Sequence, residues 1–387
     1  MNVILPEEVK QCMNILRNAG FKAYLVGGCV RDLFMEKTPH DYDITTDASP
    51  TQVISLFEQV IETGLRHGTV TVILNHMPIE ITRMRVDGEY KDGRHPETVR
   101  PTRNLYEDLS RRDFTINAMA FDGRSVTDLF RGQIDIEQKR IQTVGDPCLR
   151  FHEDALRIMR AFRFAAVLDF ELDRETRTAA LQLSPNLQKI SVERIFTELE
   201  KALLGVRPSR LLPLLEYGAL VFLGIGPPSS LVMLDRVAAV RELRFAALFY
   251  ICGSDVEHVC NQLKIDKQLF RKSSFYLQLF RNVPTHKTAI KKLLSLYDSH
   301  TITLALDTAE ILTGEEYSEA KQMLSDILLN REPYQIADLA IDGNDILHEG
   351  FQGKEVGFIL CRLLGIVYEN PEYNEKEKLL SLLHEKL

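Results

Sequence analysis

The chain has 387 residues, a length that suggests two to four domains. Of these residues 45% are hydrophobic and 26% are charged, a composition typical of globular proteins. Its formal net charge of −8 argues against a generally basic nucleic-acid-binding protein. No apolar run reaches the roughly 18–20 residues that cross a bilayer, and the N-terminus lacks a signal-peptide pattern. We therefore expect a cytoplasmic protein without a membrane partner.

The acidic charge is confined to the end of the chain. From residue 301 onward there are 17 acidic and 7 basic residues, so the preceding part has a slight basic excess. A polyanionic partner could meet basic faces there, for example the basic helical stretch 264–294, although a solvated helix face gives the same pattern. The six cysteines are scattered without a CxxC pair, which indicates reduced thiols and no zinc site.

Residues 1–140 alternate between helical and strand-like stretches, which predicts an α+β domain with a small mixed sheet. The order is a helix at 6–19, a strand at 23–28, a helix at 30–36, a strand at 41–46, a helix at 49–57, and a hairpin of strands 68–74 and 77–85 turning at Asn75 and His76.

A polar stretch, Val86 to Asn104, follows this hairpin and is unusually long for a compact domain. It is either a functional loop or a mobile insertion. From Asp146 onward the pattern is helical, with breaks that include Pro227 to Ser230. We expect four domains: a head at 1–140, a neck at 141–206, a body at 207–300 and a tail at 301–387.

Two carboxylates, Asp41 and Asp43, lie on a predicted strand and therefore on one face of it. Neighbouring carboxylates repel unless a cation lies between them, and Mg²⁺ prefers oxygen ligands. Glu80, on another predicted strand, could complete a three-carboxylate site. Two metal ions there would activate an attacking hydroxyl and stabilise a leaving oxygen. The alternatives are a solvated turn and a solvent-facing strand glutamate.

Gly27 and Gly28 precede a predicted helix, where backbone N–H groups can approach a phosphate. Further along, Arg112 offers a cation for phosphate, and Asp113 and Asn117 would share one helix face that suits a ribose. A capped helix start gives a similar string of residues. Together with the carboxylates, these features predict a site for a nucleoside triphosphate and a metal.

The predicted helix 153–164 carries Asp154, Arg157, Arg160 and Arg163 along one stripe. A surface ion pair would explain the first two, but three arginines at this spacing repel one another without an anionic partner. Asp154 and Arg157 could also read a base. A carboxylate accepts from the exocyclic amine of cytosine or adenine, and a guanidinium donates to the adjacent ring nitrogen, whereas guanine and uracil present the opposite pattern.

The ordered strings GGCVRD, DYD, RRDFTINA, EDALRIMRAFRF and ISVERIFTELEKAL resemble the motifs of class II tRNA nucleotidyltransferases, the family of bacterial CCA-adding enzymes and poly(A) polymerases. The likeness is strong over about residues 20–205. It extends more weakly to the end, through DLAIDGNDIL and GKEVGFIL. The resemblance implies an α+β nucleotidyltransferase head followed by helical neck, body and tail. It also implies addition of the 3′-terminal CCA of tRNA from CTP and ATP, with release of pyrophosphate and without a nucleic-acid template.

The resemblance implies a role for each matching residue. Asp41 and Asp43 would be the metal ligands, with Glu80 as the third catalytic carboxylate. Nucleotide contacts would come from Gly28 and Arg31 to the triphosphate, Arg112 and Asp113 to nucleotide and ribose, Asp154 and Arg157 to the base, and Arg160 and Arg163 to triphosphate or primer. The string from Glu193 and Arg194 through Glu198 to Lys201 would buttress the base-reading helix. The family also suggests a homodimer.

Three other functions remain open. Poly(A) polymerases of this family usually carry a basic string where this chain reads GLRHGTVTVI, and CC-adding enzymes lack the long loop that Val86 to Asn104 provides. In the family that loop helps the site to shift from CTP to ATP, which favours full CCA addition. A non-catalytic RNA-binding protein is disfavoured by the intact pair of Asp41 and Asp43.

Overall fold

A computed structural model describes residues 5–65, 68–88, 90, 97–228, 230 and 232–386. The chain forms two compact units, which are described separately. The first comprises residues 1–231 and 261–264, and the second comprises residues 232–260 and 265–387. The boundary between residues 231 and 232 adjoins the predicted link at Pro227 to Ser230, of which Ser229 lies outside the described residues. Within the described ranges, no helix is both long and apolar enough to span a membrane.

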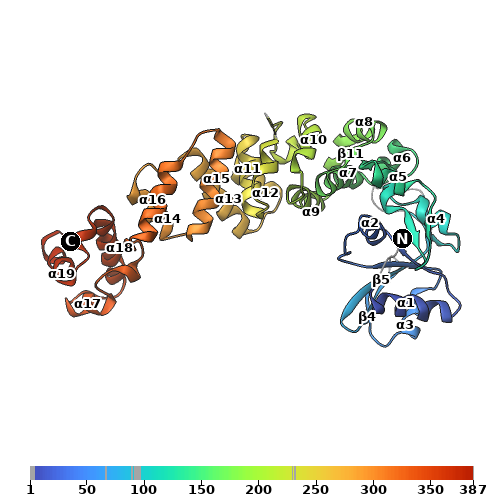
Figure 1. Cartoon of the computed structure of the whole chain (residues 1–387), viewed down its shortest axis with the longest axis horizontal. Helices are drawn as coiled ribbons and strands as arrows, with labels where there is room; N and C mark the ends of the chain where they lie inside the picture. Colours follow the sequence, from blue (N-terminus) through green and yellow to red (C-terminus); the bar gives the residue numbers. More distant parts are fainter. Residues whose placement is uncertain are drawn as a thin grey trace. The chain divides into compact units, whose positions relative to one another are not determined.

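A mixed sheet forms the centre of the head, as predicted, but it has seven strands where the sequence analysis named four (Figure 1). Its strand order is β3-β4-β5-β2-β1-β8-β9, and the pairing of β2 with β5 is parallel whereas the other pairings are antiparallel. The strands are β1 (Ala23–Val26), β2 (Asp43–Thr46), β3 (Val60–Gly64), β4 (Thr69–Leu74), β5 (Met77–Arg83), β8 (Met119–Phe121) and β9 (Val126–Asp128).

Local sequence explains most of these elements. The hairpin of β4 and β5 turns at Asn75 and His76, whose φ angles of 45° and 67° suit a tight turn between twisted strands. Helix α3 (Pro50–Leu56) begins at Ser49, whose hydroxyl accepts from the Gln52 N–H while the Gln52 side chain accepts from the Ser49 N–H. Both features confirm the predicted hairpin and helix start.

Helices α1 (Glu7–Asn18) and α3 pack side by side and against the sheet (Figure 1). The apolar face of α1, which includes Val9, Met13 and Leu16, joins inward-facing strand residues such as Ile44 in one buried core. Around this core lie α2 (Gly28–Phe34), α4 (Leu105–Ser110), the short 3₁₀ helix η2 (Thr115–Asn117) and α5 (Gly132–Glu137).

The predicted loop 86–104 contains a two-stranded ribbon that the sequence analysis missed. Strand β6 (Arg85–Asp87) pairs antiparallel with β7 (Val99–Pro101). Residues 89 and 91–96 of the loop lie outside the described residues. The base of the loop is therefore ordered by backbone pairing.

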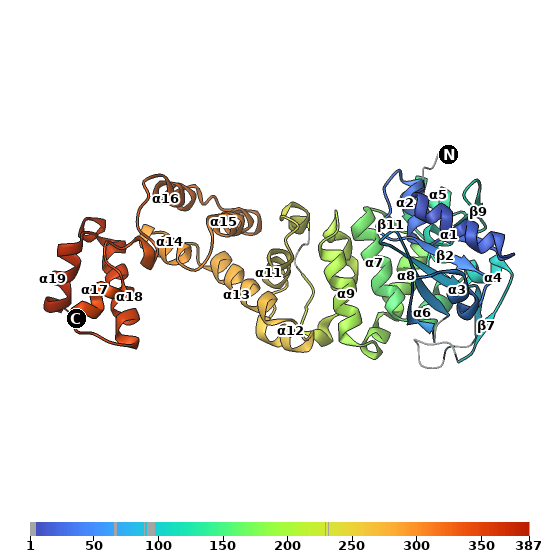
Figure 2. The ribbon, with the colours of Figure 1, turned by 90° about the horizontal axis from the view of Figure 1, so that it is seen from below.

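The neck is helical and shares a core with the head. It contains α6 (Pro147–Glu153), α7 (Leu156–Leu168), α8 (Arg174–Leu183) and α9 (Val192–Leu203), and α7 and α9 pack together (Figure 2). Phe114 and Ile116 of the head are buried together with Phe164 and Phe170 of the neck. Beside them β10 (Arg140–Ile141) pairs parallel with β11 (Glu171–Leu172). The predicted boundary near residue 140 therefore crosses a common core, and the four-domain division stays a prediction.

One predicted helix is interrupted. The sequence predicts a continuous helix over 153–164, but α6 ends at Glu153 and α7 begins at Leu156. Asp154 lies between them with extended backbone angles, φ −145° and ψ 106°. Its carboxylate accepts from the N–H of Leu156 at 2.9 Å, so it caps the start of α7 instead of lying within a helix.

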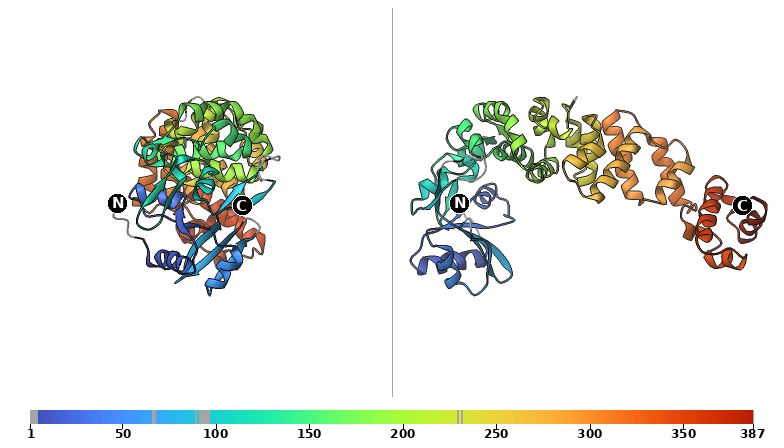
Figure 3. Two further views of the ribbon diagram at one scale, coloured as in Figure 1. Left: turned by 90° about the vertical axis from the view of Figure 1, so that its right-hand side faces the viewer. Right: turned by 180° about the vertical axis from the view of Figure 1, so that it is seen from behind.

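The second unit is built from helices (Figure 3). Helix α13 (Lys267–Arg281) packs between α11 (Arg241–Ile251) and α15 (Ser299–Thr313). The buried Lys291 ammonium of α14 (Lys287–Leu294) contacts Glu332 at 2.8 Å and the carbonyl of Tyr368 at 3.4 Å. Further helices are α12 (Val256–Gln262), α16 (Ser318–Leu329), α17 (Gly343–His348), α18 (Lys354–Glu369) and α19 (Lys376–Lys386). The last three enclose an apolar core of their own.

The contact between α7 and α9 leads to a stability prediction. A Cβ on Gly205, just after α9, would lie 2.6 Å from the Ala166 carbonyl oxygen and 2.9 Å from the Val167 nitrogen. Because backbone atoms cannot rotate away, Gly205→Ala should destabilise the first unit by about 1–3 kcal/mol. Thermal unfolding followed by circular dichroism measures this effect.

Gly365 provides a contrasting substitution, because it lies inside α18 and a Cβ there would meet nothing within 4 Å. Gly365→Ala should leave the melting temperature unchanged or raise it slightly, since alanine favours the helix by about 0.5–1 kcal/mol. Equal melting temperatures for the Gly205 variant and the parent would contradict the packing argument.

Candidate active site

The parallel pairing of β2 with β5 brings two predicted site carboxylates together. Asp43 is the first residue of β2 and lies in register with Glu80 on β5, so their side chains project from the same face of the sheet. Asp41 does not share the strand, contrary to the prediction. It lies in a bend before β2, where its largely exposed carboxylate contacts Nδ1 of His40 at 3.0 Å.

The charge of Asp43 is costly in this place. Burial, together with the nearby charges of Glu80 and Asp41, raises the pKa of Asp43 to about 6 against the opposing charge of Arg112. In the described part of the chain, no group of three or more His, Cys, Asp or Glu side chains is assembled to hold a metal ion. The donor set itself, exposed and half-buried carboxylates that repel one another, suits a hard divalent cation with oxygen ligands.

The glycine that matters most for this geometry is Gly27. It has φ 80° and ψ −141°, a conformation that is open essentially only to glycine. A Cβ on Gly27 would lie 3.3 Å from Nη1 of Arg112 and 3.4 Å from Oδ2 of Asp43. The predicted contact residue Gly28 is less constrained, since a Cβ there would meet only Arg31 at an ordinary 3.5 Å. Gly27 therefore allows a guanidinium and a carboxylate to meet at the turn.

A buried carboxylate that the sequence analysis missed holds the two arginines of the RRD string. Asp108 is fully buried on α4 and accepts from Nη2 of Arg111 at 2.8 Å and from Nη2 of Arg112 at 3.5 Å. It also accepts from the Thr45 hydroxyl on β2 at 3.2 Å. Burial alone would raise the pKa of Asp108, but the charges of Arg111 and Arg112 hold it below its ordinary value. Its spacing of three and four residues from the arginines was the available sequence signal.

Asp113 and Asn117 meet, although not on a helix face as predicted. Asp113 precedes an extended residue, and Asn117 ends the 3₁₀ helix η2. The Asn117 amide still donates to Oδ1 of Asp113 at 3.4 Å, and Arg160 donates to Oδ2 at 2.8 and 2.6 Å. Burial would raise the pKa of Asp113, but the Arg160 charge and hydrogen bonds prevail and lower it to about 2.

Arg31 is held firmly by the protein. Its Nε and Nη2 donate to Oδ1 of Asp32 at 2.9 and 2.7 Å, and its Nη1 donates to Oδ1 of Asn117 at 2.8 Å. Its guanidinium also lies 5.3 Å from the centre of the Phe164 ring on α7. Arg31 thus connects the head helix α2 to η2 and to the neck.

The two predicted base-reading residues are adjacent but paired with other partners. Arg157 donates from Nη1 to Glu153 at 2.6 Å and from Nη2 to the backbone carbonyl of Arg111 at 3.2 Å. Asp154 accepts from Nη2 of Arg194 on α9 at 3.0 Å. These contacts fix both side chains at the start of α7.

Every arginine of the predicted stripe has a protein carboxylate as its partner. Arg157 pairs with Glu153, Arg160 with Asp113, and Arg163 with Glu198 on α9. The anionic partners that this spacing requires are therefore present within the protein, because acidic residues from three other segments neutralise the arginines. The buttressing string pairs with this region through Arg194 and Glu198, which the family resemblance had implied.

The loop ribbon touches the same region through its acidic end. Asp87 at the end of β6 contacts Arg85 at 3.0 Å and Arg111 at 3.7 Å, and accepts from the hydroxyl of Tyr90 at 2.9 Å. The string GLRHGTVTVI, which distinguishes this chain from poly(A) polymerases in the sequence analysis, is only partly described, because Arg66 and His67 lie outside the described residues.

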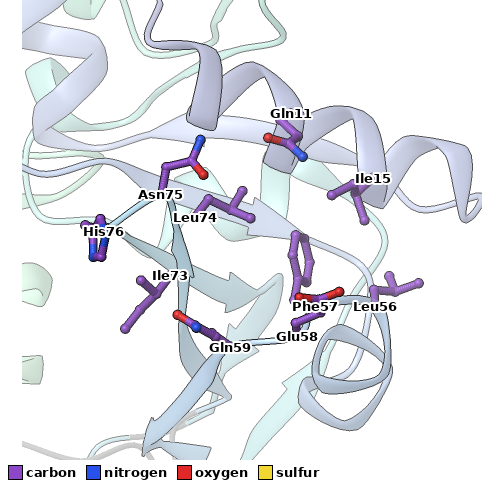
Figure 4. Close-up of a pocket in the computed structure, with 10 residues that line it drawn as sticks. All are labelled: Gln11, Ile15, Leu56, Phe57, Glu58, Gln59, Ile73, Leu74, Asn75 and His76. Carbon is purple, nitrogen blue, oxygen red and sulfur yellow. The ribbon is translucent and has the colours of Figure 1, made fainter.

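A cavity of about 520 Å³ in the head lies away from these residues (Figure 4). It is lined by α1, by the connection from α3 to β3, and by the hairpin of β4 and β5. None of the predicted site residues lines it. The site is therefore defined by its charged side chains and not by this cavity.

Comparisons with known proteins agree with this architecture. Residues 23–142 match the family described as Poly A polymerase head domain, and residues 169–223 match the probable RNA and SrmB-binding site of polymerase A. The chain is 35% identical to a CCA-adding enzyme of Geobacillus sp. over 379 residues, covering 96% of this chain and 93% of the relative. It is also 35% identical to a CCA-adding enzyme of Enterococcus faecalis, covering 97% and 96%.

Solved structures show the same fold. The Bacillus stearothermophilus CCA-adding enzyme in complex with CTP matches with a TM-score of 0.82 at 30% identity, covering 99% of this chain and 98% of that one. The Thermotoga maritima CCA-adding enzyme complexed with tRNA matches with a TM-score of 0.69 at 20% identity, covering 99% and 96%. With a nucleotidyltransferase head and full-length relatives of one kind, the chain belongs to the CCA-adding enzymes, a family of tRNA nucleotidyltransferases.

Proposed function

We propose that this chain adds the 3′-terminal CCA of tRNA, using CTP and ATP and releasing pyrophosphate. The observation that carries the proposal is the position of two consecutive arginines. The Arg112 guanidinium lies beside Asp43 at the Gly27 turn, and the Arg111 carbonyl accepts from the base-reading Arg157. Two adjacent residues thus connect the carboxylates that would perform the chemistry with the residues that would choose the nucleotide.

Mg²⁺ is the proposed metal, and Asp41 and Asp43 are its proposed ligands, with Glu80 beside them as the third catalytic carboxylate. When bound, the metal would lower the pKa of the attacking hydroxyl and neutralise charge on the leaving pyrophosphate. Asp41 is largely exposed, so it can leave His40 without breaking a buried contact. Asp43 and Glu80 already share one face of the sheet through their register.

The triphosphate is assigned to a group of guanidiniums. Arg112 lies next to Asp43, and its buried Nε has no hydrogen-bond partner among the described residues. Arg160 remains one-third exposed despite its pairing with Asp113, and Arg163 and Arg31 lie close to it around Phe164. Asp113 could accept from the ribose while Gly28 lines the turn.

Base choice is assigned to Asp154 and Arg157. Two Arg157 nitrogens donate to Glu153 and to the Arg111 carbonyl, which fixes the guanidinium plane and leaves further N–H groups for a ring nitrogen. Asp154 is held by Arg194 and keeps acceptor capacity for an exocyclic amine. This pair admits cytosine and adenine and rejects guanine and uracil, with protein groups as the template.

The second unit would hold the tRNA. In the basic stretch 264–294, several lysines are paired within the protein, for example Lys272 with Glu242 and Lys287 with Glu332. The side chains of Lys267, Arg271 and Arg281 on α13 are exposed and could contact phosphates. The homodimer implied by the family stays a prediction.

The test uses purified protein, Mg²⁺ and a tRNA transcript that lacks its last three nucleotides. CTP alone should add two residues, CTP with ATP should add three, and GTP or UTP should add none, because the base reader requires an amine beside an unprotonated ring nitrogen. Denaturing gels with single-nucleotide resolution measure each product. If extension stops after two nucleotides although ATP is present, the chain is a CC-adding enzyme. A long run of A without C would indicate a poly(A) polymerase. No extension of the tRNA with CTP would contradict the proposal.

The two glycines at the turn should respond differently to substitution. Gly27→Ala should reduce kcat/KM by at least about 100-fold, since its Cβ would crowd Arg112 at 3.3 Å and its backbone would adopt a conformation that costs a non-glycine residue about 1–3 kcal/mol. Gly28→Ala should retain activity within about tenfold, because its Cβ fits at ordinary contact distance. Steady-state CMP addition on the shortened tRNA provides both values, and equal losses in the two variants would contradict this assignment.

The raised pKa of Asp43 gives a stability prediction that does not depend on turnover. Because the folded-state pKa of about 6 exceeds the ordinary 3.8, the ionised carboxylate destabilises the metal-free protein above pH 6. This cost is at most about 3 kcal/mol, at about 1.4 kcal/mol per pKa unit. Asp43→Asn should therefore melt at or above the parent at pH 8 without metal, and the parent should gain on the variant as the pH falls through 6.

Adding Mg²⁺ at pH 8 completes this experiment. Mg²⁺ should raise the melting temperature of the parent and have little effect on Asp43→Asn, since the variant lacks a ligand charge. Asp32→Asn is not a suitable control because Asp32 holds Arg31, so the exposed Glu316→Gln in the second unit serves instead. An equal Mg²⁺ response in parent and Asp43 variant would contradict the proposed metal site.

A further inference from the structure

Phe164 lies among three arginine side chains. It is on α7, is 6% exposed, and has the guanidinium carbons of Arg163, Arg31 and Arg160 at 3.9, 5.3 and 5.4 Å from its ring centre. All three distances lie within the roughly 6 Å at which a ring attracts a cation. Arg31 comes from the head, whereas Arg160 and Arg163 come from the same neck helix as the ring.

The ring is itself fixed by packing. Phe114 contacts it edge-on, with ring centres 5.7 Å apart and an interplanar angle of 79°. Phe114 directly follows Asp113, which accepts both hydrogen bonds of Arg160. The head therefore contacts the neck helix through an aromatic pair and, beside it, through a charged pair.

Carboxylates hold one side of each arginine. Asp32 holds Arg31, Asp113 holds Arg160 and Glu198 holds Arg163. The three guanidiniums repel one another. Burial and the charge of Arg160 lower the pKa of Arg163, although the carboxylate of Glu198 opposes this shift. The ring adds attraction without adding a net negative charge, so the cluster stays suited to an anion.

We propose that Phe164 is a positioning residue that holds Arg31 and Arg160 for the triphosphate of the incoming nucleotide. The inference rests on the proposed function and extends it to a residue that touches no substrate. The group that Arg31 and Arg160 would bind is the triphosphate, which CTP and ATP share. Loss of the ring should therefore weaken binding of both nucleotides equally and leave the choice of base, at Asp154 and Arg157, unchanged.

The experiment replaces the ring with aliphatic side chains. Phe164→Leu and Phe164→Met keep an apolar side chain and remove the aromatic face. Each should raise KM for CTP and for ATP by about tenfold, the combined effect of weakened contacts to the cations, with kcat changed less than about threefold. The ratio of the two KM values should stay that of the parent.

Phe170→Leu is the matched control, because Phe170 is buried in the same apolar cluster and has no guanidinium among its described contacts. Melting temperatures of the Leu variants should fall by similar amounts, whereas only the Phe164 variants should change KM. An equal KM increase in Phe170→Leu, or an unchanged KM in both Phe164 variants, would overturn the inference.

Inorganic tripolyphosphate isolates the phosphate contact from the base. Its dissociation constant, measured by calorimetry with the full chain and Mg²⁺, should rise about tenfold in Phe164→Leu and stay unchanged in Phe170→Leu. An unchanged constant in Phe164→Leu would overturn the inference. A parent that binds tripolyphosphate in this Phe164-dependent way but never extends tRNA would overturn the proposed function and support the inference.

Discussion

The largely buried carboxylate of Asp43, which faces like charges, is the constraint on which the site depends. Parallel pairing of β2 with β5 places Asp43 opposite Glu80 on one face of the sheet. The pKa of Asp43 rises to about 6, mainly because its carboxylate is buried and further because Glu80 and Asp41 carry like charges. An uncharged residue at position 43 would remove this cost from the metal-free protein. The destabilisation is confined to a short segment, and it disappears if a divalent cation neutralises the carboxylates.

Around Asp43, the arginine side chains are neutralised by carboxylates of the protein, whereas Asp43 and Glu80 lie beside each other as like charges. Arg111 and Arg112 are held by buried Asp108, Arg160 by Asp113, and Arg163 by Glu198. Pre-paired arginines lose less conformational freedom when an anion arrives, because their side chains are already ordered. The site therefore resembles a preorganised electrostatic environment, in which donors keep their places before the charged substrate binds.

The neck contributes orientation more than chemistry. Helix α9 contacts Arg163 of α7 through Glu198 and contacts Asp154, just before α7, through Arg194. Gly205 follows α9, at a point where the chain passes close to the backbone of α7. Asp154 gains two fixed partners because the predicted helix is interrupted there and its carboxylate caps α7. The packing of these two helices therefore fixes Asp154, one of the two side chains proposed to choose the base.

The sequence by itself determined most elements of the head as far as the β4–β5 hairpin and the helical remainder, and it named most of the charged residues proposed for the site. Hairpin and capping signals are local, so the turn at Asn75 and His76 and the start of α3 followed from neighbouring residues alone. The tertiary structure decided the partners. Asp154 pairs with Arg194, Arg160 with Asp113, and Arg163 with Glu198, because which carboxylate neutralises which arginine depends on contacts between segments that are distant in the chain. Asp108 and Phe164 acquired their roles in the same way, through burial against several elements, which a linear pattern of residues does not encode.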